Sequence, residues 1–246
     1  RVPALLSAGH MSKLTLRYRF TFPDSSERAF SLEMDRDTAE LTPSKRTDLP
    51  AWTELAFNQC SGCPFDASKV RHCPAAVHLS TVIDGFQHLV SYDTVRVSVE
   101  SEERSVTATL SAQQALASLM GLVMASSGCP KTAVFRPMAR CHLPFSNESE
   151  TAYRVAAMYL VAQHFPLKDG QTPDLALEHL ERVYRGVHAV NRGMVQRLRA
   201  ASRQGAIVNA IVLLDVYSSL VPAAIHDILD EIRPAFEPLL KNGAEG

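Results

Sequence analysis

Four of the five cysteines in this chain stand in a pattern that restricts how it can fold. Cys60 and Cys63 form a C-x2-C pair, Cys73 follows closely, and Cys129 lies far downstream. Proline directly follows the last three of these. Thiolates are ligands of zinc and of iron–sulfur clusters, and a C-x2-C pair lets one short loop fill two coordination positions. If the four share one centre, residues 60–73 must fold back against the downstream cysteine.

The bulk composition is that of an ordinary globular protein. Apolar residues make up 46% of the 246 residues and charged residues 21%. The 25 basic and 26 acidic side chains leave a net charge of −1. This balance argues against a general nucleic-acid or membrane-surface binder, so neither partner is expected. No apolar run approaches the roughly 20 residues that span a bilayer.

The start of the chain indicates the cellular compartment. Residues 1–10 precede Met11, which is typical of a native start, and they lack the basic region and long apolar core of a secretory signal. They are therefore interpreted as a cloning remnant. Without an export signal we expect a reducing, cytoplasmic setting. Cysteines stay reduced there, which favours metal binding over disulfides.

Apolar and polar residues alternate in two parts of the chain. The first part comprises residues 13–22 and 30–34, separated by a turn. The second comprises residues 95–99 and 106–110. A period of two is typical of half-buried strands, so each part predicts an antiparallel hairpin.

Two helices are predicted beside these hairpins. Pro74 opens the first, which carries an apolar stripe to about Val90. Ser111 and Gln114 form a capping box that begins the second, and Gly128 ends it as a left-handed C-cap.

Everything from Asn147 onward predicts helix. Asn147 and Glu150 form another capping box, for a helix to about Phe165. Thr172 and Pro173 are expected to begin a helix that runs nearly to residue 203. Two more helical pieces follow, and the residues expected to break them are Pro222 and Pro234.

The predicted fold class is therefore α+β. Residues 11–145 form a β-hairpin and helix region that carries the four-cysteine site. Residues 146–246 form an all-helical region, expected to pack as one unit with the first.

The positions of the cysteines within these elements favour ligation. Cys73 is the N-cap of a predicted helix, where backbone N–H groups and the positive dipole end favour a thiolate over a thiol. Gly62 permits a tight turn between Cys60 and Cys63. Cys129 follows a helix end at which the chain reverses.

Two kinds of centre suit these ligands. Structural zinc sites usually draw on two paired knuckles, whereas here one pair is joined by two cysteines that arrive singly. A 4Fe–4S cluster is bulkier and suits ligands that arrive singly, although the ferredoxin spacing is absent. We expect a 4Fe–4S cluster, with zinc as the alternative. Inert buried thiols and a redox-active or disulfide pair are the other interpretations.

Three neighbouring residues are less suited to ligation. His72 is expected to face solvent, because the adjacent Cys73 faces the centre. His78, one turn into the helix, is expected to be packed or capped. Cys141, the fifth cysteine, is expected to fill an apolar gap.

A basic segment after the last ligand supplies a competing function. Arg136, Arg140 and His142 could line a substrate pocket beside the centre, which would make the protein an iron–sulfur enzyme. Salt bridges from this segment to Glu148 and Glu150 are the favoured interpretation.

The remaining arginines and the known catalytic motifs add little. The arginines of the long helix at 173–203 do not form one stripe, so a solvated face is expected there. The chain contains no Walker loop, dinucleotide fingerprint, zincin motif or nucleophile elbow. No catalytic residue is assigned, and a non-enzymatic role is preferred.

Taken together, the motifs resemble a family of uncharacterised bacterial proteins described only as a domain of unknown function. The shared motifs are C-x2-C-P at residues 60–64, C-P-x-A at 73–76, S-G-C-P at 127–130 and R-P-M-x-R-x-H-L-P-F at 136–145, allowing for position 141. The resemblance runs from about Lys13 to Leu240. Because the family usually has an aromatic residue where Cys141 stands, the resemblance implies that Cys141 is not a ligand. It strengthens the four-cysteine assignment and implies no activity.

We therefore expect a protein that binds one metal centre through Cys60, Cys63, Cys73 and Cys129. The expected use is redox or metal-responsive regulation, or interaction with a protein partner through the helical half. The competing hypotheses are the iron–sulfur enzyme and a structural zinc that ties the cysteine loop to the helices.

Overall fold

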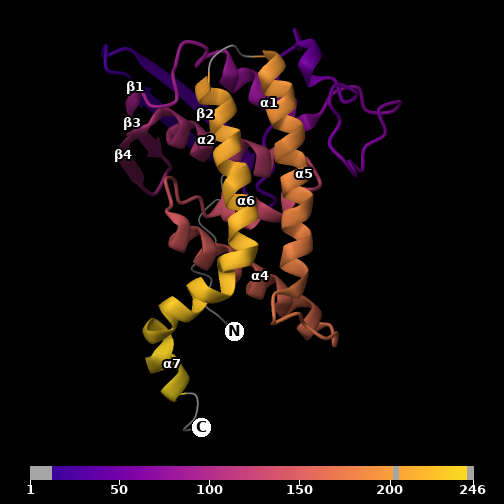
Figure 1. Cartoon of the computed structure of the whole chain (residues 1–246), viewed down its shortest axis with the longest axis vertical. Coiled ribbons are helices and arrows are strands. Elements are labelled where there is room, and N and C mark those ends of the chain that lie inside the picture. The colour runs from indigo at the N-terminus through magenta and orange to yellow at the C-terminus, as the bar shows by residue number, and fades with distance from the viewer. Residues whose placement is uncertain (1–12, 202–204, 243–246) are drawn as a thin grey trace.

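The computed structural model describes residues 13–201 and 205–242. Its strands form one antiparallel sheet in the order β2-β1-β3-β4 (Figure 1). The strands are β1 (Lys13–Thr21), β2 (Glu27–Asp35), β3 (Thr94–Glu100) and β4 (Ser105–Ser111). Both predicted hairpins are confirmed, and so is the α+β class. The interpretation of residues 1–10 concerns a segment outside the described residues.

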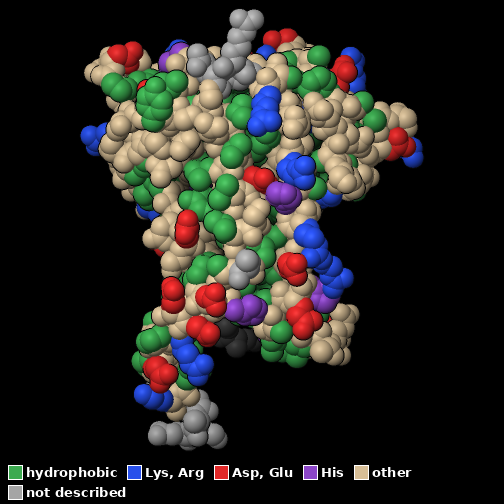
Figure 2. Space-filling model, in the orientation of Figure 1, with side chains coloured by type: hydrophobic (Ala, Val, Ile, Leu, Met, Phe, Trp, Pro, Cys, Tyr) green, Lys and Arg blue, Asp and Glu red, His purple; other side chains and the backbone are tan. Residues whose placement is uncertain are grey.

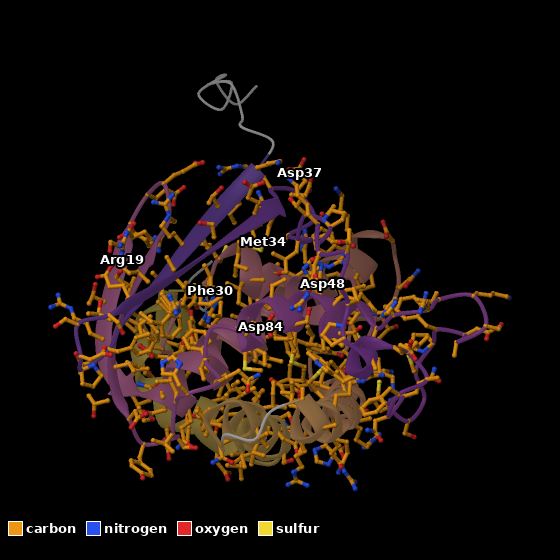
Figure 3. The ribbon with its side chains drawn as sticks, turned by 90° about the horizontal axis from the view of Figure 1, so that it is seen from above. Arg19, Phe30, Met34, Asp37, Asp48 and Asp84 are labelled. Carbon is orange, nitrogen blue, oxygen red and sulfur yellow. The ribbon has the colours of Figure 1, made fainter. Side chains whose placement is uncertain are left out.

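Pairing of β1 with β3 joins the two hairpins into one sheet. Tyr18 lies opposite Val99 and Phe20 opposite Val97, and all four side chains are buried. Because side chains alternate between the two faces of a strand, the intervening polar residues of β1 lie on the outer face. Figure 3 labels Arg19 on this strand, whose guanidinium pairs with Glu27 at 3.0 Å.

Helices make up most of the remaining chain. Their bounds are η1 (Ala51–Thr53), α1 (Pro74–Ile83), α2 (Ala112–Ser126), η2 (Ala133–Phe135), α3 (Arg136–Arg140), α4 (Glu148–Lys168), α5 (Glu178–Ala201), α6 (Gly205–Ile232), η3 (Arg233–Phe236) and α7 (Glu237–Asn242). The long helices α5 and α6 run side by side (Figure 1), and α6 also packs against α2 and α4.

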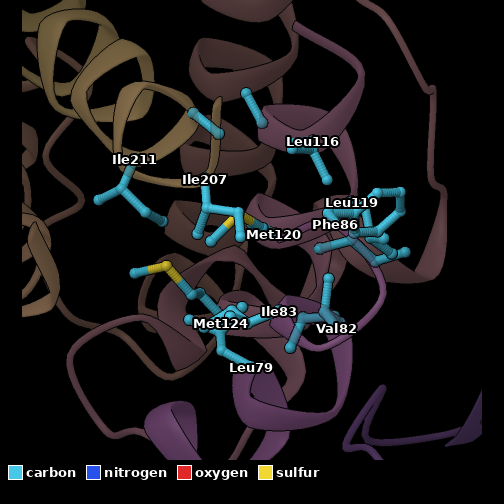
Figure 4. Close-up of a cluster of buried hydrophobic side chains, with 14 of the residues drawn as sticks. Leu79, Val82, Ile83, Phe86, Leu116, Leu119, Met120, Met124, Ile207 and Ile211 are labelled. Carbon is cyan, nitrogen blue, oxygen red and sulfur yellow. The ribbon is translucent and has the colours of Figure 1, made fainter. Parts of the chain in front are cut away.

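The main hydrophobic core lies between the sheet and these helices. Figure 4 shows Leu79 of α1, Met120 of α2 and Ile207 of α6 meeting in one cluster. Phe86 joins this cluster and contacts the sheet through the rings of Phe20 and Phe30. The C-terminal helices therefore share a core with the N-terminal sheet.

The predicted helix caps are confirmed. The side chain of Gln114 accepts a hydrogen bond from the Ser111 backbone N–H at 3.2 Å. The Asn147 and Glu150 side chains accept hydrogen bonds from each other's backbone N–H groups at 2.8 and 2.9 Å. Gly128 has a φ of +85°, the left-handed conformation expected where a glycine ends a helix.

Helix α1 is shorter than predicted, because it ends at Ile83 instead of about Val90. Gly85 donates to the Val82 carbonyl at 3.2 Å, and Phe86 donates to the Ile83 carbonyl at 3.0 Å. These short-range bonds tighten the chain into turns, and glycine favours this departure from the helix.

The prediction that Thr172 and Pro173 begin the long helix is wrong, because α5 begins at Glu178. Asp174 sets this start, since its carboxylate accepts from the backbone N–H groups of Glu178 at 3.1 Å and His179 at 2.7 Å. The positive N-terminal end of a helix is stabilised by a nearby carboxylate, which explains why Asp174 sets the boundary.

Proline does not break α6 as predicted. Pro222 lies inside the helix, where its ring removes one backbone hydrogen bond without ending it. Helix α4 likewise continues past Phe165 and includes Pro166. The break at Pro234 is confirmed, because α6 gives way to the short helix η3 there.

Helix α6 is unusually apolar on its exposed side. Figure 2 shows hydrophobic side chains gathered over this helix, and Val212, Val216 and Leu220 are exposed along it. Residues 205–222 are long and apolar enough to cross a membrane by length and composition alone. A core helix passes the same test, and α6 packs against α2 and α5.

Candidate metal centre

The four predicted ligands come from a long loop and from two helix ends. Cys60 and Cys63 lie in the loop between η1 and α1, Cys73 is the N-cap of α1, and Cys129 follows the end of α2. The last two are 8% and 7% exposed, while the first two are half-buried and pack against the main core.

Local hydrogen bonds hold the two loop cysteines in a tight turn. The Cys63 backbone N–H donates to the Cys60 carbonyl at 3.0 Å, and Gly62 between them has a φ of +64°. This is the conformation for which glycine was predicted at this position.

The thiols lie close enough for their charges to affect one another. The pKa of Cys60 is raised to about 11, first by burial and then by the negative charges of Cys63, Cys73 and Cys129. Lys131 acts in the opposite direction. The structure thus brings the four predicted residues into one electrostatic neighbourhood.

Burial has a larger effect on the pKa of Cys73 than the N-terminal end of α1 has. It raises the pKa of this thiol, while the N–H groups of Ala75 and Ala76 and the charge of Arg197 act against it. The predicted influence of the helix N-terminus is present, but the expected net preference for a thiolate is wrong. A thiol buried without a metal is favoured in its neutral form.

Helix α5 covers the cysteine loop from the outside. A methyl group added at Gly193 would lie 3.0 Å from Cβ of Cys60, so only glycine allows this approach without a shift. Lys131 also holds the loop, because its Nζ donates to the Ser61 carbonyl at 2.6 Å.

Arg197 of α5 is the most buried cation near the site, at 2% exposed. Its guanidinium donates to the backbone carbonyls of Trp52 and Glu54 at 2.6 Å and of Leu55 at 3.0 Å. Burial lowers its pKa, and the charges of the nearby cysteines oppose that shift. The prediction of a solvated arginine face on α5 is therefore wrong for this residue.

Three neighbours of the cysteines were not predicted from the sequence: Arg197, Gly193 and Lys131. A signal for Arg197 was present, because it stands in the buried helical stripe with Val190, Met194 and Leu198. Nothing in the local sequence could place Gly193 against a loop more than a hundred residues upstream.

None of the predicted ligands is part of a disulfide bond. All five cysteines are free, so no disulfide pair is formed among them. Within residues 13–201 and 205–242, no group of three or more His, Cys, Asp and Glu side chains is placed to hold a metal ion.

The other candidate ligands lie in ordinary structural positions. His72 is half-buried and its Nδ1 hydrogen-bonds Thr53 Oγ1 at 2.9 Å, so the prediction that it faces solvent is wrong. His78 is partly buried, as predicted, and burial lowers its pKa. Cys141 is exposed, so it does not fill an apolar gap.

The two arginines of the basic segment make contacts away from the cavity that His142 lines. Arg136 pairs with Glu40 at 2.8 Å, and Arg140 approaches the Asp37 carbonyl at 3.5 Å. These contacts replace the expected salt bridges to the start of α4. His142 lies apart from both arginines, hydrogen-bonded through Nε2 to the buried Tyr18 hydroxyl, and lines a cavity that neither arginine reaches.

Comparison with known proteins leaves the function open. No curated protein and no solved structure matches the chain. A family model described as a domain of unknown function, DUF6901, matches residues 16–237. The chain therefore belongs to the DUF6901 family of domains of unknown function.

Proposed function

We propose that this protein binds one metal centre through Cys60, Cys63, Cys73 and Cys129, and that the centre is a 4Fe–4S cluster. The proposal rests on two observations: all four cysteines pack in or against one hydrophobic core, and the charges of Cys63, Cys73 and Cys129 act on Cys60. The four cysteines are contributed by separate segments that share one core, with a tight C-x2-C turn on one side. Soft thiolate ligands in this number suit an iron–sulfur cluster or zinc.

Two cations support a charged centre at this position. Four thiolates around iron or zinc leave a net negative charge, which is costly to bury unless it is compensated. Arg197 and Lys131 act electrostatically on the cysteines from two sides. Each is also anchored to a backbone carbonyl of the loop, so the compensation is built into the fold.

The loop gives such a centre a means of regulation. When bound, a 4Fe–4S cluster can accept or release one electron, and its loss leaves four free thiols. Residues 54–73 contain no long helix or strand and are held by the cysteines, Lys131 and Arg197. Loss of the centre would loosen the loop where it contacts α5. We propose redox or metal-responsive regulation, read out through the helical half by a protein partner.

The experiment is metal analysis of protein purified without oxygen. Iron, acid-labile sulfide and zinc are measured per chain, together with the visible absorption spectrum. A cluster predicts about four iron and four sulfide per chain and a brown protein. One zinc in a colourless protein would refute the cluster and retain the centre, and absence of both metals would refute the centre.

Matched cysteine variants test the ligand set. Cys73→Ser and Cys129→Ser should each lose most of the bound metal, because serine is a poor ligand for these centres. Cys141→Ser is the control, since this exposed cysteine is not among those that act on Cys60. Retention of the wild-type metal content by Cys73→Ser would contradict the assignment.

A further inference from the structure

A cavity of about 720 Å³ opens between α2, α4, α5 and α6. Its volume falls within the range of about 300–1,000 Å³ that is typical of small-molecule sites. None of the four cysteines lines it, so it is distinct from the candidate metal centre. Apolar side chains form most of its wall, which favours a ligand that is itself largely apolar.

Two buried polar side chains on α5 also line this cavity. Tyr184 is 5% exposed and lines the cavity. Asn191 is 2% exposed and makes a single hydrogen bond, to Ser218 Oγ at 3.3 Å. Neither residue is among those with a buried, unpartnered side-chain polar atom in the described part of the chain, so they add polar groups to the wall without requiring a ligand.

Arg154 brings a positive charge to the same cavity. Its guanidinium donates to the carbonyls of Met138 at 3.1 Å and Cys141 at 2.9 Å, and to Ser146 Oγ at 3.4 Å. These acceptors are all neutral. A guanidinium has five N–H groups, so two are left for a further acceptor. Burial lowers the pKa of Arg154, and the charges of Cys141 and Glu150 oppose that shift.

The surrounding ionisable groups compensate this charge only in part. His142 beside it is held neutral by burial, which lowers its pKa to about 3. Glu148 also lines the cavity but is exposed, so solvent and salt screen it. Glu150 acts on Arg154, but its carboxylate already accepts from the Asn147 backbone N–H.

We propose that this cavity binds an elongated apolar molecule that carries one carboxylate. The carboxylate accepts from a free N–H group of Arg154, and the apolar part lies between α2 and α6. A carboxylate suits this position because an ionised acceptor makes a shorter and stronger hydrogen bond to a guanidinium N–H than a neutral acceptor does. The proposal does not depend on the metal centre.

Calorimetric titration with decanoate and with decanol tests the proposal. Decanoate should bind to one site per chain, and decanol should bind about tenfold to a hundredfold more weakly, since a charge-assisted hydrogen bond is worth about 1.5–3 kcal/mol. Failure of decanoate to bind, or equal affinity for both molecules, would overturn it.

Three variants locate the site. Arg154→Gln should bind decanoate as weakly as decanol, whereas Arg140→Gln, a nearby exposed arginine outside the cavity, should bind like wild type. Val187→Phe places a larger side chain in the cavity wall and should weaken both molecules at least tenfold. Circular dichroism checks that each variant is folded. Wild-type binding by both Arg154→Gln and Val187→Phe would refute this location.

Discussion

Replacement of Arg197 by methionine should lower the free energy of unfolding by about 3 kcal/mol. The guanidinium is buried and joins α5 to the loop that begins at η1. Methionine retains an unbranched apolar stem of similar length, so the substitution tests the hydrogen bonds more than the packing.

The magnitude follows from the three carbonyls that Arg197 serves. The Glu54 carbonyl keeps a second donor, the Phe57 backbone N–H at 3.1 Å. Those of Trp52 and Leu55 have no other donor among the described residues. A buried acceptor left unpaired costs about 1–3 kcal/mol, so two cost about 4 kcal/mol. The substitution also removes the desolvation cost of burying the cation, which offsets about 1 kcal/mol of this loss.

Urea unfolding gives the test. The chain has a single tryptophan, Trp52, whose carbonyl is one of the acceptors, so its fluorescence reports on the loop directly. Circular dichroism reports on the helices in the same samples. Arg199→Met is the control, because Arg199 is exposed on the same helix and should change stability by no more than about 0.5 kcal/mol. A loss of less than about 1 kcal/mol for Arg197→Met would refute the assigned role.

Two further changes test other parts of the fold. Gly193→Ala should destabilise the protein by about 1–3 kcal/mol, because the new methyl group would meet Cys60. Gly186→Ala on the same helix is the control. A methyl group there has its nearest neighbour 4.0 Å away, so this change should be neutral or stabilising by up to about 1 kcal/mol. Equal thermal shifts for the two would rule out the close approach. Burial lowers the pKa of His142 from 6.5 to about 3 in the folded protein. As the pH falls, the unfolded chain therefore takes up a proton at this histidine before the folded chain does. The free energy of unfolding should decrease as the pH drops from about 6.5 towards 3. His142→Gln should flatten that part of a stability–pH curve, and an unchanged slope would count against the buried neutral histidine.

Features of the fold that depend on nearby residues were predictable from the sequence. The capping boxes at Ser111 and Asn147 and the glycine stop at Gly128 each involve residues within one turn of the chain. The pairing of β1 with β3 joins residues about eighty positions apart, and no local pattern specifies it. Pro222 was misjudged for a related reason, because α6 packs against three other helices and this tertiary packing outweighs the local penalty.

The same distinction between local and distant residues applies to the candidate site. Spacing and residue type identified the four cysteines. The residues of α5 that approach the cysteine loop, Gly193 and Arg197, come from a helix that the sequence places far from the loop. Arg197 was assigned to a solvated face because arginine is rarely buried, and its hydrogen bonds to three carbonyls are the exception that makes burial favourable.

The contact of α5 with the cysteine loop also orders events during biosynthesis. All four cysteines leave the ribosome before Gly193 and Arg197 are made, and at about 5–20 residues per second the interval is on the order of several seconds. During that time the nascent chain carries its cysteines without the helix that later covers them. We expect metal delivered in this interval to meet an open loop, and metal delivered afterwards to meet a loop already closed by α5. Loading during translation and loading of the finished protein should therefore proceed at different rates.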